Sequence, residues 1–293
     1  MQGKLEGVDL IHLLESQFES LSPQLKIAAR YIVSAPEEVA VYSMREIASR
    51  AQVKPATMVR LANRFGYENY NTFRDTFRES VTPPTSGYAA RARELQLRRD
   101  RKAASGLLSE FREAEIENID RTYGSISDSL LEKSAAACVN ADRVFVVGLR
   151  KCFSVASFFH YATRVFFQNS KLVQGCAGLF REEIEGISGK DLVVAIAFEP
   201  YTRETVETTN LAKERGCKVI AITDSSVSPL AKNADFVFLV ANRSPSFYRS
   251  LSGALSVAQA LVAAIVTHLG ESAVQALEQS DASLRASNTY WYN

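Results

Sequence analysis

The sequence predicts an all-α domain followed by an α/β domain, in which helices cover both faces of a parallel sheet. Residues 8–80 carry apolar side chains at helical spacing. From residue 140 onwards, short apolar and β-branched runs alternate with helical segments, which is typical of parallel sheets. The chain has 293 residues, 46% of them hydrophobic, enough for two domains with separate cores.

We expect a helical domain over residues 1–80, a linker over 81–104 and the α/β domain over 105–293. Residues 81–87 are rich in Thr, Pro, Ser and Gly, a composition typical of linkers. Residues 91–102 contain six basic and two acidic side chains. This segment is interpreted as an exposed connecting helix, with contact to a DNA backbone as the alternative.

In the helical domain, residues 8–34 form an amphipathic region that is interrupted at Leu21-Ser22-Pro23. Ser22 is expected to cap the helix that Pro23 begins, because proline lacks an N–H and suits the first helical position. Residues 35–38 mark the next boundary, and residues 71–77 start the last helix of this domain.

Residues 43–65 predict two short helices joined by a tight turn at residues 52–54. The apolar side chains of each helix share one face, and Pro55 suits the start of the second helix. Gly66 suits a left-handed residue at its end. This is the helix-turn-helix plan, in which the second helix lies in the major groove of DNA.

The local charge agrees with that plan. Residues 43–65 contain five basic residues and one acidic residue, whereas residues 1–42 contain three basic and six acidic ones. One basic face fits the neutralisation of phosphates on double-stranded operator DNA, with a solvated helix face as the alternative. The predicted contact residues, expected to face outward, are Thr57, Arg60, Asn63 and Arg64 in the second helix, with Ser43, Arg45 and Lys54 around it.

Four strong strands and one weak strand are expected in the α/β domain. Their alternation with helices implies right-handed crossovers and a parallel sheet. Ligands of such sheets bind beyond the carboxyl ends of the strands, so loops 148–154, 197–205 and 223–228 form the candidate site. The strong strands cover residues 143–147, 191–197, 218–222 and 236–240, the weak one covers 172–173, and a helix covers 203–215.

Composition narrows the cellular setting. The four cysteines are widely spaced, without a C-x-x-C pair, and the N-terminus lacks the pattern of a signal peptide. No apolar run is expected to approach the roughly 20 residues that span a bilayer. We therefore expect a cytoplasmic, reduced protein with no membrane partner, structural metal or cofactor. The formal net charge of +1 decides nothing about nucleic acid.

Both halves resemble one family. Residues 21–23, 35–40 and 43–73 are similar to the DNA-binding half of the RpiR/MurR transcription regulators. Residues 219–225 and 228–231 resemble the most recognisable part of the sugar isomerase (SIS) domain that follows in that family. The resemblance implies a helix-turn-helix domain joined to a SIS domain that binds a carbohydrate-derived effector.

Two loops depart from the phosphosugar-binding pattern of SIS domains. In place of Gly-x-Gly-x-Ser after the first strand, residues 148–152 read Gly-Leu-Arg-Lys-Cys. In place of Ser-x-Ser-Gly-x-Thr, residues 197–202 read Ala-Phe-Glu-Pro-Tyr-Thr. The effector site predicted from the three loops is Gly148, Arg150, Lys151, Cys152, Ser154, Glu199, Thr202, Arg203, Thr223 and Ser225.

Two ligand classes fit these loops. Arg150, Lys151 and Arg203 outnumber Glu199 and favour a phosphorylated or acidic sugar, held by charge-assisted hydrogen bonds. Glu199 would instead accept hydroxyls from an uncharged polyol. Loops that have lost their ligand and serve assembly are the third possibility. Cys152 is interpreted as a packing residue, with a redox-sensing thiol as the alternative.

We predict a transcriptional regulator and not an enzyme. Of the few histidines, His12 lies in the predicted DNA-binding half, and His160 and His268 are interpreted as packed or surface residues. Glu199 and Glu204 are placed to act as bases in the alternative, a sugar-phosphate isomerase with an appended helical domain. A third possibility is a metabolite sensor whose helical domain binds protein. The regulator is expected to be a homodimer or homotetramer assembled through its SIS domains, with operator affinity changed by the effector.

Overall fold

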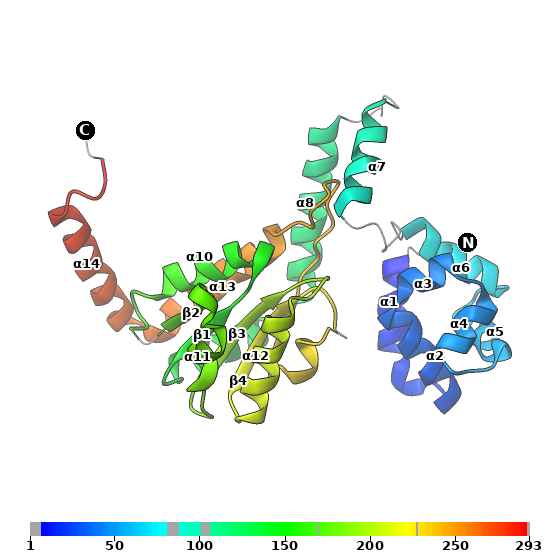
Figure 1. Ribbon diagram of the computed structural model, residues 1–293, viewed down its shortest axis with the longest axis horizontal. Coiled ribbons are helices and arrows are strands. Elements are labelled where there is room, and N and C mark those ends of the chain that lie inside the picture. The colour runs from blue at the N-terminus through cyan, green and yellow to red at the C-terminus, as the bar shows by residue number, and fades with distance from the viewer. Residues whose placement is uncertain (1–6, 81–87, 101–105, 169, 227, 292–293) are drawn as a thin grey trace. The chain divides into compact units, whose positions relative to one another are not determined.

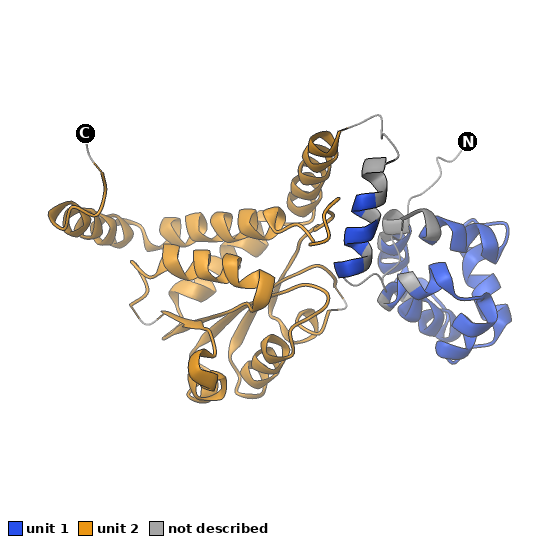
Figure 2. Ribbon diagram, turned by 45° about the horizontal axis from the view of Figure 1, so that its top comes forward, with its two compact units in different colours: residues 1–101 blue, residues 102–293 orange. Residues whose placement is uncertain are grey.

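The computed structural model describes residues 7–80, 88–100, 106–168, 170–226 and 228–291 (Figure 1). The chain divides into two compact units, residues 1–101 and residues 102–293 (Figure 2). The expected linker residues 81–87 and 101–104 lie outside the described residues. Between them lies α7 (Tyr88–Asp100), over the basic segment for which a connecting helix is predicted.

The first unit is a set of helices around one apolar core. Helices α1 to α6 all contribute buried side chains to it, and Met58, Phe73 and Phe77 are among the largest. The elements are α1 (Gly7–Ser16), η1 (Phe18–Ser20), α2 (Pro23–Ser34), α3 (Pro36–Val41), α4 (Met44–Arg50), α5 (Pro55–Arg64) and α6 (Tyr70–Ser80).

The predicted helix boundaries hold at the prolines and at Gly66. α2 begins at Pro23 and α5 at Pro55. Gly66 follows α5 with a φ of 84°, the left-handed conformation expected there. The expectation that the Ser22 side chain caps α2 is wrong, because Ser22 stands at the N-cap but makes no side-chain cap hydrogen bond.

The second unit is built on a five-stranded parallel sheet with the strand order β2-β1-β3-β4-β5. All five predicted strands are present, and the weak one is longer than predicted. Because the strand order reverses at β1 and β3, the carboxyl ends of these neighbours form the crevice where ligands bind in such sheets. The strands are β1 (Val144–Val147), β2 (Ser170–Val173), β3 (Leu192–Ala197), β4 (Lys218–Thr223) and β5 (Phe236–Leu239).

Helices bury both faces of this sheet, which confirms the predicted fold class. Alternate residues of β1 enter opposite cores: Val144 and Val146 pack on one face, Phe145 and Val147 on the other. The first face is covered by α9 (Asp128–Val139), α10 (Phe153–Thr163) and α13 (Ser252–Leu269), on which α8 (Leu107–Gly124) packs. The second is covered by α11 (Phe180–Glu185) and α12 (Arg203–Glu214), and α14 (Glu271–Ala286) follows α13.

Helix α13 is 18 residues long, and among the described residues it is the one helix long and apolar enough to span a membrane. The expectation that no apolar run approaches that length is therefore wrong. Its buried residues include Val257, Leu261 and Ile265, which belong to the same core as β1, β3 and β4. The apolar composition of α13 is thus that of a core helix.

Candidate functional site

The exposed face of α5 carries the predicted DNA-contacting side chains, with one exception. Arg60, Asn63 and Arg64 are exposed. Thr57 is only 7% exposed, so the expectation that it faces outward is wrong. The reason is helical geometry: Thr57 lies four residues before the fully buried Leu61 and shares its side of the helix.

Around α5, two predicted contacts are exposed and one is occupied within the protein. Arg45 and Lys54 are exposed, on α4 and directly before α5. The Ser43 Oγ accepts a hydrogen bond from the Glu46 N–H at 3.4 Å, and the Glu46 carboxylate accepts one from the Ser43 N–H at 2.9 Å. This capping box fixes the start of α4, and its hydrogen bonds hold the pKa of Glu46 below its usual value. The Ser43 oxygen thus already accepts a hydrogen bond within the protein, and the hydroxyl can contact a phosphate only by donating its proton.

Arg50 contributes to the charge of residues 43–65 but is engaged inside the unit. Its Nη1 donates to both carboxylate oxygens of Glu38, at 3.2 and 3.1 Å. Its guanidinium also lies 4.0 Å from the centroid of the Tyr42 ring. One of the five positive charges counted from the sequence is therefore paired with a carboxylate within the protein.

In the second unit, the loop after β1 turns tightly against the sheet. A side chain at Gly148 would place its Cβ 3.0 Å from the Cys152 carbonyl oxygen, a tight contact that would force the neighbouring atoms to shift, so the turn favours glycine. Arg150 is exposed and adopts a φ of 54° in the short 3₁₀ turn η2 (Arg150–Cys152). The Ser154 hydroxyl donates to the Lys151 carbonyl at 3.0 Å and so fixes the start of α10.

Cys152 is buried beneath this loop. Its side chain is 3% exposed, and burial raises the pKa of its thiol to about 11 in spite of the neighbouring Lys151. Since the thiolate is the reactive form, this environment favours the packing interpretation over a redox sensor.

Lys151 joins the first loop to the loop after β3. Its Nζ donates to the Glu199 carbonyl oxygen at 3.2 Å and lies 5.9 Å from the centroid of the Phe198 ring. Glu199 is exposed and is followed by Pro200 through a cis peptide bond. Thr202 stands at the N-cap of α12 and makes no side-chain cap hydrogen bond there. The first backbone N–H groups of α12 therefore adjoin this loop, in a position that favours an anion.

Arg203 does not join these groups. Its Nε donates to the Glu207 carboxylate at 2.8 Å, one turn along α12, and its side chain is 87% exposed. The structure thus brings Lys151 and Glu199 together, and it directs Arg203 along the outer surface of the helix.

Asp224 lies in the predicted loop 223–228 but is absent from the predicted site residues, and its hydrogen bonds link the loops. Its carboxylate accepts hydrogen bonds from the Glu199 N–H at 3.1 Å, the Tyr201 hydroxyl at 2.8 Å and the Asn242 side-chain amide at 3.3 Å. Burial, together with this carboxylate, raises the pKa of Tyr201, so its phenol stays protonated and donates. The one sequence signal for Asp224 is its place directly after Thr223, the last residue of β4.

The remaining predicted residues of this edge serve the fold in different ways. Thr223 is buried, and its hydroxyl donates to the Ala197 carbonyl at 3.0 Å, which links the ends of β4 and β3. Ser225 is half-buried in the following loop. A fourth loop, residues 240–251 after β5, also reaches this edge through Asn242 and is missing from the sequence prediction.

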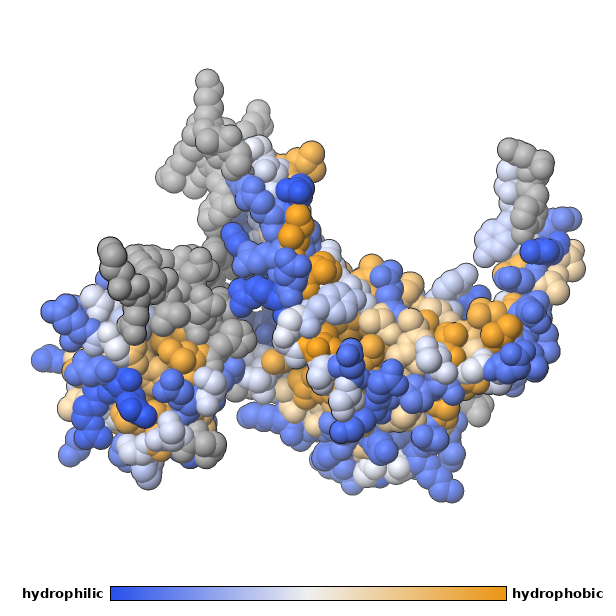
Figure 3. Space-filling model, turned by 180° about the vertical axis from the view of Figure 1, so that it is seen from behind, coloured by the Kyte–Doolittle hydropathy of each residue, from blue (hydrophilic) through white to orange (hydrophobic). Residues whose placement is uncertain are grey.

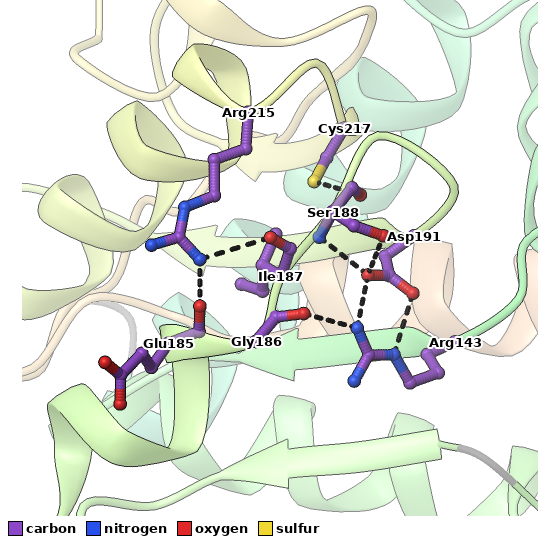
Figure 4. Close-up of polar contacts among 8 residues, drawn as sticks. All are labelled: Arg143, Glu185, Gly186, Ile187, Ser188, Asp191, Arg215 and Cys217. Atoms are coloured by element: carbon purple, nitrogen blue, oxygen red, sulfur yellow. Dashed lines mark hydrogen bonds and ion pairs between the residues drawn. The ribbon is translucent and has the colours of Figure 1, made fainter.

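The opposite, amino edge of the sheet is closed by its own polar network (Figure 4). Arg143 donates to both carboxylate oxygens of the buried Asp191, which also accepts the Ser188 hydroxyl at 2.9 Å. Arg215 donates to the carbonyl oxygens of Glu185 and Ile187. These groups satisfy one another, so this edge is structural.

A groove of about 700 Å³ lies on the flank of the sheet, between α11 and α12. Its lining mixes arginines, carboxylates and apolar side chains from the two helices. It contains none of the predicted effector residues and is separate from the carboxyl-edge loops.

Comparison with known proteins finds proteins that are similar to both units. Residues 138–264 match the SIS domain family. The sugar isomerase domain of an RpiR transcription factor from Sphaerobacter thermophilus superposes with a TM-score of 0.58 and 28% identity, over 61% of this chain and 99% of that one. HTH-type transcriptional regulators match across both units: one from Clostridium perfringens is 23% identical (78% of this chain, 80% of the relative), and HexR of Escherichia coli is 24% identical (78% and 76%).

The chain resembles transcriptional regulators of the RpiR/MurR type in both sequence and fold, and these matches support a regulator of that kind. Its second unit contains the SIS domain, and α4 and α5 of its first unit form the helix-turn-helix. The Vibrio vulnificus NanR protein, solved as a complex with ManNAc-6P, shares the fold of this RpiR-type chain. The TM-score is 0.58 at 21% identity, over 94% of this chain and 98% of NanR.

Proposed function

We propose that this RpiR-type regulator binds operator DNA through α5 and changes its DNA affinity when a phosphorylated sugar binds its SIS domain. The observation that carries the proposal is the convergence of Lys151, Glu199 and the N-terminus of α12 at the carboxyl ends of β1 and β3. The ammonium group and the helix N-terminus favour a phosphate, and the Glu199 carboxylate can accept sugar hydroxyls. A sugar phosphate uses both kinds of group.

The DNA-binding half of the proposal uses the exposed side chains of the helix-turn-helix. Arg60, Asn63 and Arg64 would contact bases or phosphates from α5, and Arg45 and Lys54 would hold the backbone beside it. The buried Thr57 is left out of this set, and Ser43 keeps a minor place through its hydroxyl proton. A cytoplasmic location accompanies the proposal, because operator DNA lies in that compartment.

The isomerase alternative is less favoured by the positions of the histidines. The His160 Nδ1 lies 2.9 Å from the hydroxyl of Ser170, which opens β2, so this imidazole is at the amino edge of the sheet. His268 pairs with Glu132 at 2.7 Å, at the end of α13. Neither imidazole lies in the carboxyl-edge loops, where a general base would have to reach the sugar.

We further propose that the SIS-containing units assemble the regulator into a homodimer or homotetramer. Helix α14 leaves the end of α13 and extends away from the sheet, with Val274 and Leu277 about half exposed at 44% and 40% (Figure 1). Apolar side chains also lie along α8 and across the middle of the unit (Figure 3), and Leu108 and Ile116 are exposed on α8. Light scattering on the full chain and on a chain ended at Gly270 would test the contribution of α14.

The effector proposal is tested with a duplex that the full chain selects from a random-sequence pool. Its dissociation constant is measured with ManNAc-6P, a panel of other hexose phosphates, the unphosphorylated sugars and inorganic phosphate. We expect one sugar phosphate to change the dissociation constant by about 5–150-fold, the range of ordinary allosteric coupling. DNA binding that no sugar phosphate alters would refute the effector half of the proposal.

Matched variants locate the site. Lys151→Ala should weaken sugar-phosphate binding by more than about 10-fold, the scale of a lost charge-assisted hydrogen bond. Arg203→Ala removes an equal charge from the same edge, but it should change binding by less than about 3-fold because Arg203 is paired with Glu207 on the surface. Turnover of a sugar phosphate that Glu199→Gln abolishes would support the isomerase instead.

A further inference from the structure

Loop 240–251 connects the effector crevice with helix α8. Near its start, the Asn242 side chain donates to the Asp224 carboxylate at 3.3 Å. Near its end, the Ser250 N–H donates to the Asn242 carbonyl at 3.0 Å, which closes the loop on itself. The hydrogen bond to Asp224 therefore helps to hold the Asn242 side chain in place. The Asn242 carbonyl in turn holds the end of the loop near its start.

Polar side chains of helix α8 form hydrogen bonds with the same loop. Asn118 is 1% exposed; its Nδ2 donates to the Arg243 carbonyl at 2.7 Å, and its Oδ1 accepts the Arg243 N–H at 2.9 Å. Two bonds from one planar amide fix both the position and the orientation of residue 243. The Ser250 hydroxyl donates to the Glu115 carboxylate at 2.7 Å and anchors the end of the loop to α8 as well.

The joint between α8 and the loop is tightly packed. The Thr122 Oγ1 accepts the Ala241 N–H at 3.1 Å. A Cβ at Gly253 would lie 2.8 Å from that same Oγ1 and 3.0 Å from the Ala241 carbonyl oxygen, so the Thr122 side chain and the Ala241 backbone leave no room for a side chain there. Interiors packed in this way transmit a displacement instead of absorbing it.

We propose that Asp224, Asn242 and Asn118 couple the effector crevice to α8 and through it to the DNA-binding unit. The inference rests on the proposed function and names the regulation of that site. α8 begins at Leu107, five residues beyond the boundary between the two units. Along the chain, α8 is the first described helix of the second unit, and it lies between the helix-turn-helix and the residues that match the SIS domain.

The switching event is a competition for one carboxylate. Asp224 accepts three donors, and the bond from Asn242 is the longest of them. A sugar hydroxyl that donates to Asp224 displaces this weakest donor first, because hydrogen bonds weaken with length. The side chain of Asn242 then loses its hydrogen bond to Asp224. The adjacent Arg243 backbone shifts, and its two hydrogen bonds to the Asn118 side chain change.

The test uses the full chain, the selected duplex and the sugar phosphate that gives the largest response in the panel. Asn242→Ala should bind this sugar phosphate within about 3-fold of the native chain, since it removes no group that holds the ligand. Its DNA affinity should respond to the sugar by less than about 2-fold, because the coupling is broken. The matched control is Asn140→Ala, which removes an exposed amide bonded to the Ala136 carbonyl at 2.8 Å on α9 and should keep the full response.

A second variant predicts a gain instead of a loss. In Asn242→Asp a second carboxylate faces Asp224, so the hydrogen bond is replaced by repulsion. Without any sugar, the DNA affinity of this variant should move towards that of the native chain with the sugar bound. Hydrogen exchange should show the same change over residues 107–124 in this variant and in the sugar-bound native chain.

The outcomes separate the two proposals. If no sugar phosphate binds, the effector half of the proposed function fails and this coupling fails with it. If the sugar binds and alters DNA affinity equally in the native chain and in Asn242→Ala, the proposed function stands and the coupling through Asn242 is wrong. Loss of the response in Asn242→Ala with binding retained supports the coupling.

Discussion

Arg143 and Asp191 form a bidentate ion pair that links the start of β1 to the start of β3. Nε lies 2.9 Å from Oδ1 and Nη2 lies 2.7 Å from Oδ2. Burial acts to raise the pKa of Asp191, but the hydrogen bonds from Arg143 and Ser188 outweigh it and leave the pKa below its usual value. A lowered pKa means that the contribution of Asp191 to stability is complete above its unfolded-state value and is lost as the pH falls below it.

Asp191→Asn should destabilise the chain by about 2–3 kcal/mol at pH 7, less than the roughly 3–5 kcal/mol of a fully buried pair, because the Arg143 side chain is 30% exposed. Urea unfolding of both proteins measures the difference, which should shrink as the pH falls below about 4. The exposed pair Arg203–Glu207 is the control, since Arg203→Ala should cost less than about 0.5 kcal/mol. An Asp191→Asn effect that is equal at pH 7 and pH 3 would contradict the assignment.

Thr57 and Arg60 should behave differently although they are three residues apart on α5. Arg60→Ala should weaken binding to the selected duplex by about 1–3 kcal/mol and relax its base preference, or lower the salt slope by about one if it contacts a phosphate. Thr57→Val keeps the volume of a side chain that is 7% exposed, so affinity and preference should stay unchanged. Fluorescence anisotropy at several salt concentrations measures both. A large loss in Thr57→Val would reverse our assignment of the α5 surface.

The thiols should react in two clearly separated phases. Cys176 is exposed, whereas burial raises the pKa of Cys152 and Cys217 to about 11 and that of Cys138 to about 12. Titration of the native chain with a disulfide reagent at pH 8 should therefore show one fast thiol, and Cys176→Ser should abolish this phase. If Cys152→Ser also removed a fast-reacting thiol, the result would support the interpretation of Cys152 as a redox-sensing thiol.

Gly148→Ala tests the tight turn at the crevice. The added methyl would lie 3.0 Å from both the Cys152 carbonyl oxygen and the Ala156 Cβ, so the chain should lose about 1–3 kcal/mol of stability through overpacking. Gly124→Ala is the matched control: its added methyl meets no atom within 4 Å, and the expected change is below about 1 kcal/mol. Thermal unfolding of the two variants measures the contrast. Equal melting temperatures would show that the loop after β1 can move aside.

The parts that the sequence predicts are those encoded by local periodicity. β1, β3 and β4 are buried on both faces, so each is a continuous apolar run that stands out in the sequence. β2 has only Val173 fully buried, so the start of this strand does not stand out in the sequence. The hydrogen bonds that Asp224 accepts from Glu199 and Asn242 join residues 25 and 18 positions apart, in loops that only the strand order brings together. The sequence also does not show that the Thr57 side chain faces inward, because threonine suits either the buried or the exposed side of a helix.

The two outermost strands, β2 and β5, are each four residues long, and β2 carries the exposed Lys171 at its second position. Short edge strands offer another chain few free backbone groups for pairing, and the charged Lys171 opposes pairing further on β2, which protects a sheet against edge-to-edge aggregation. Copies of this chain therefore have little reason to associate by extending the sheet. Whatever stoichiometry the regulator adopts, its subunits should meet through helices, and amyloid-like assembly should be rare even at high concentration.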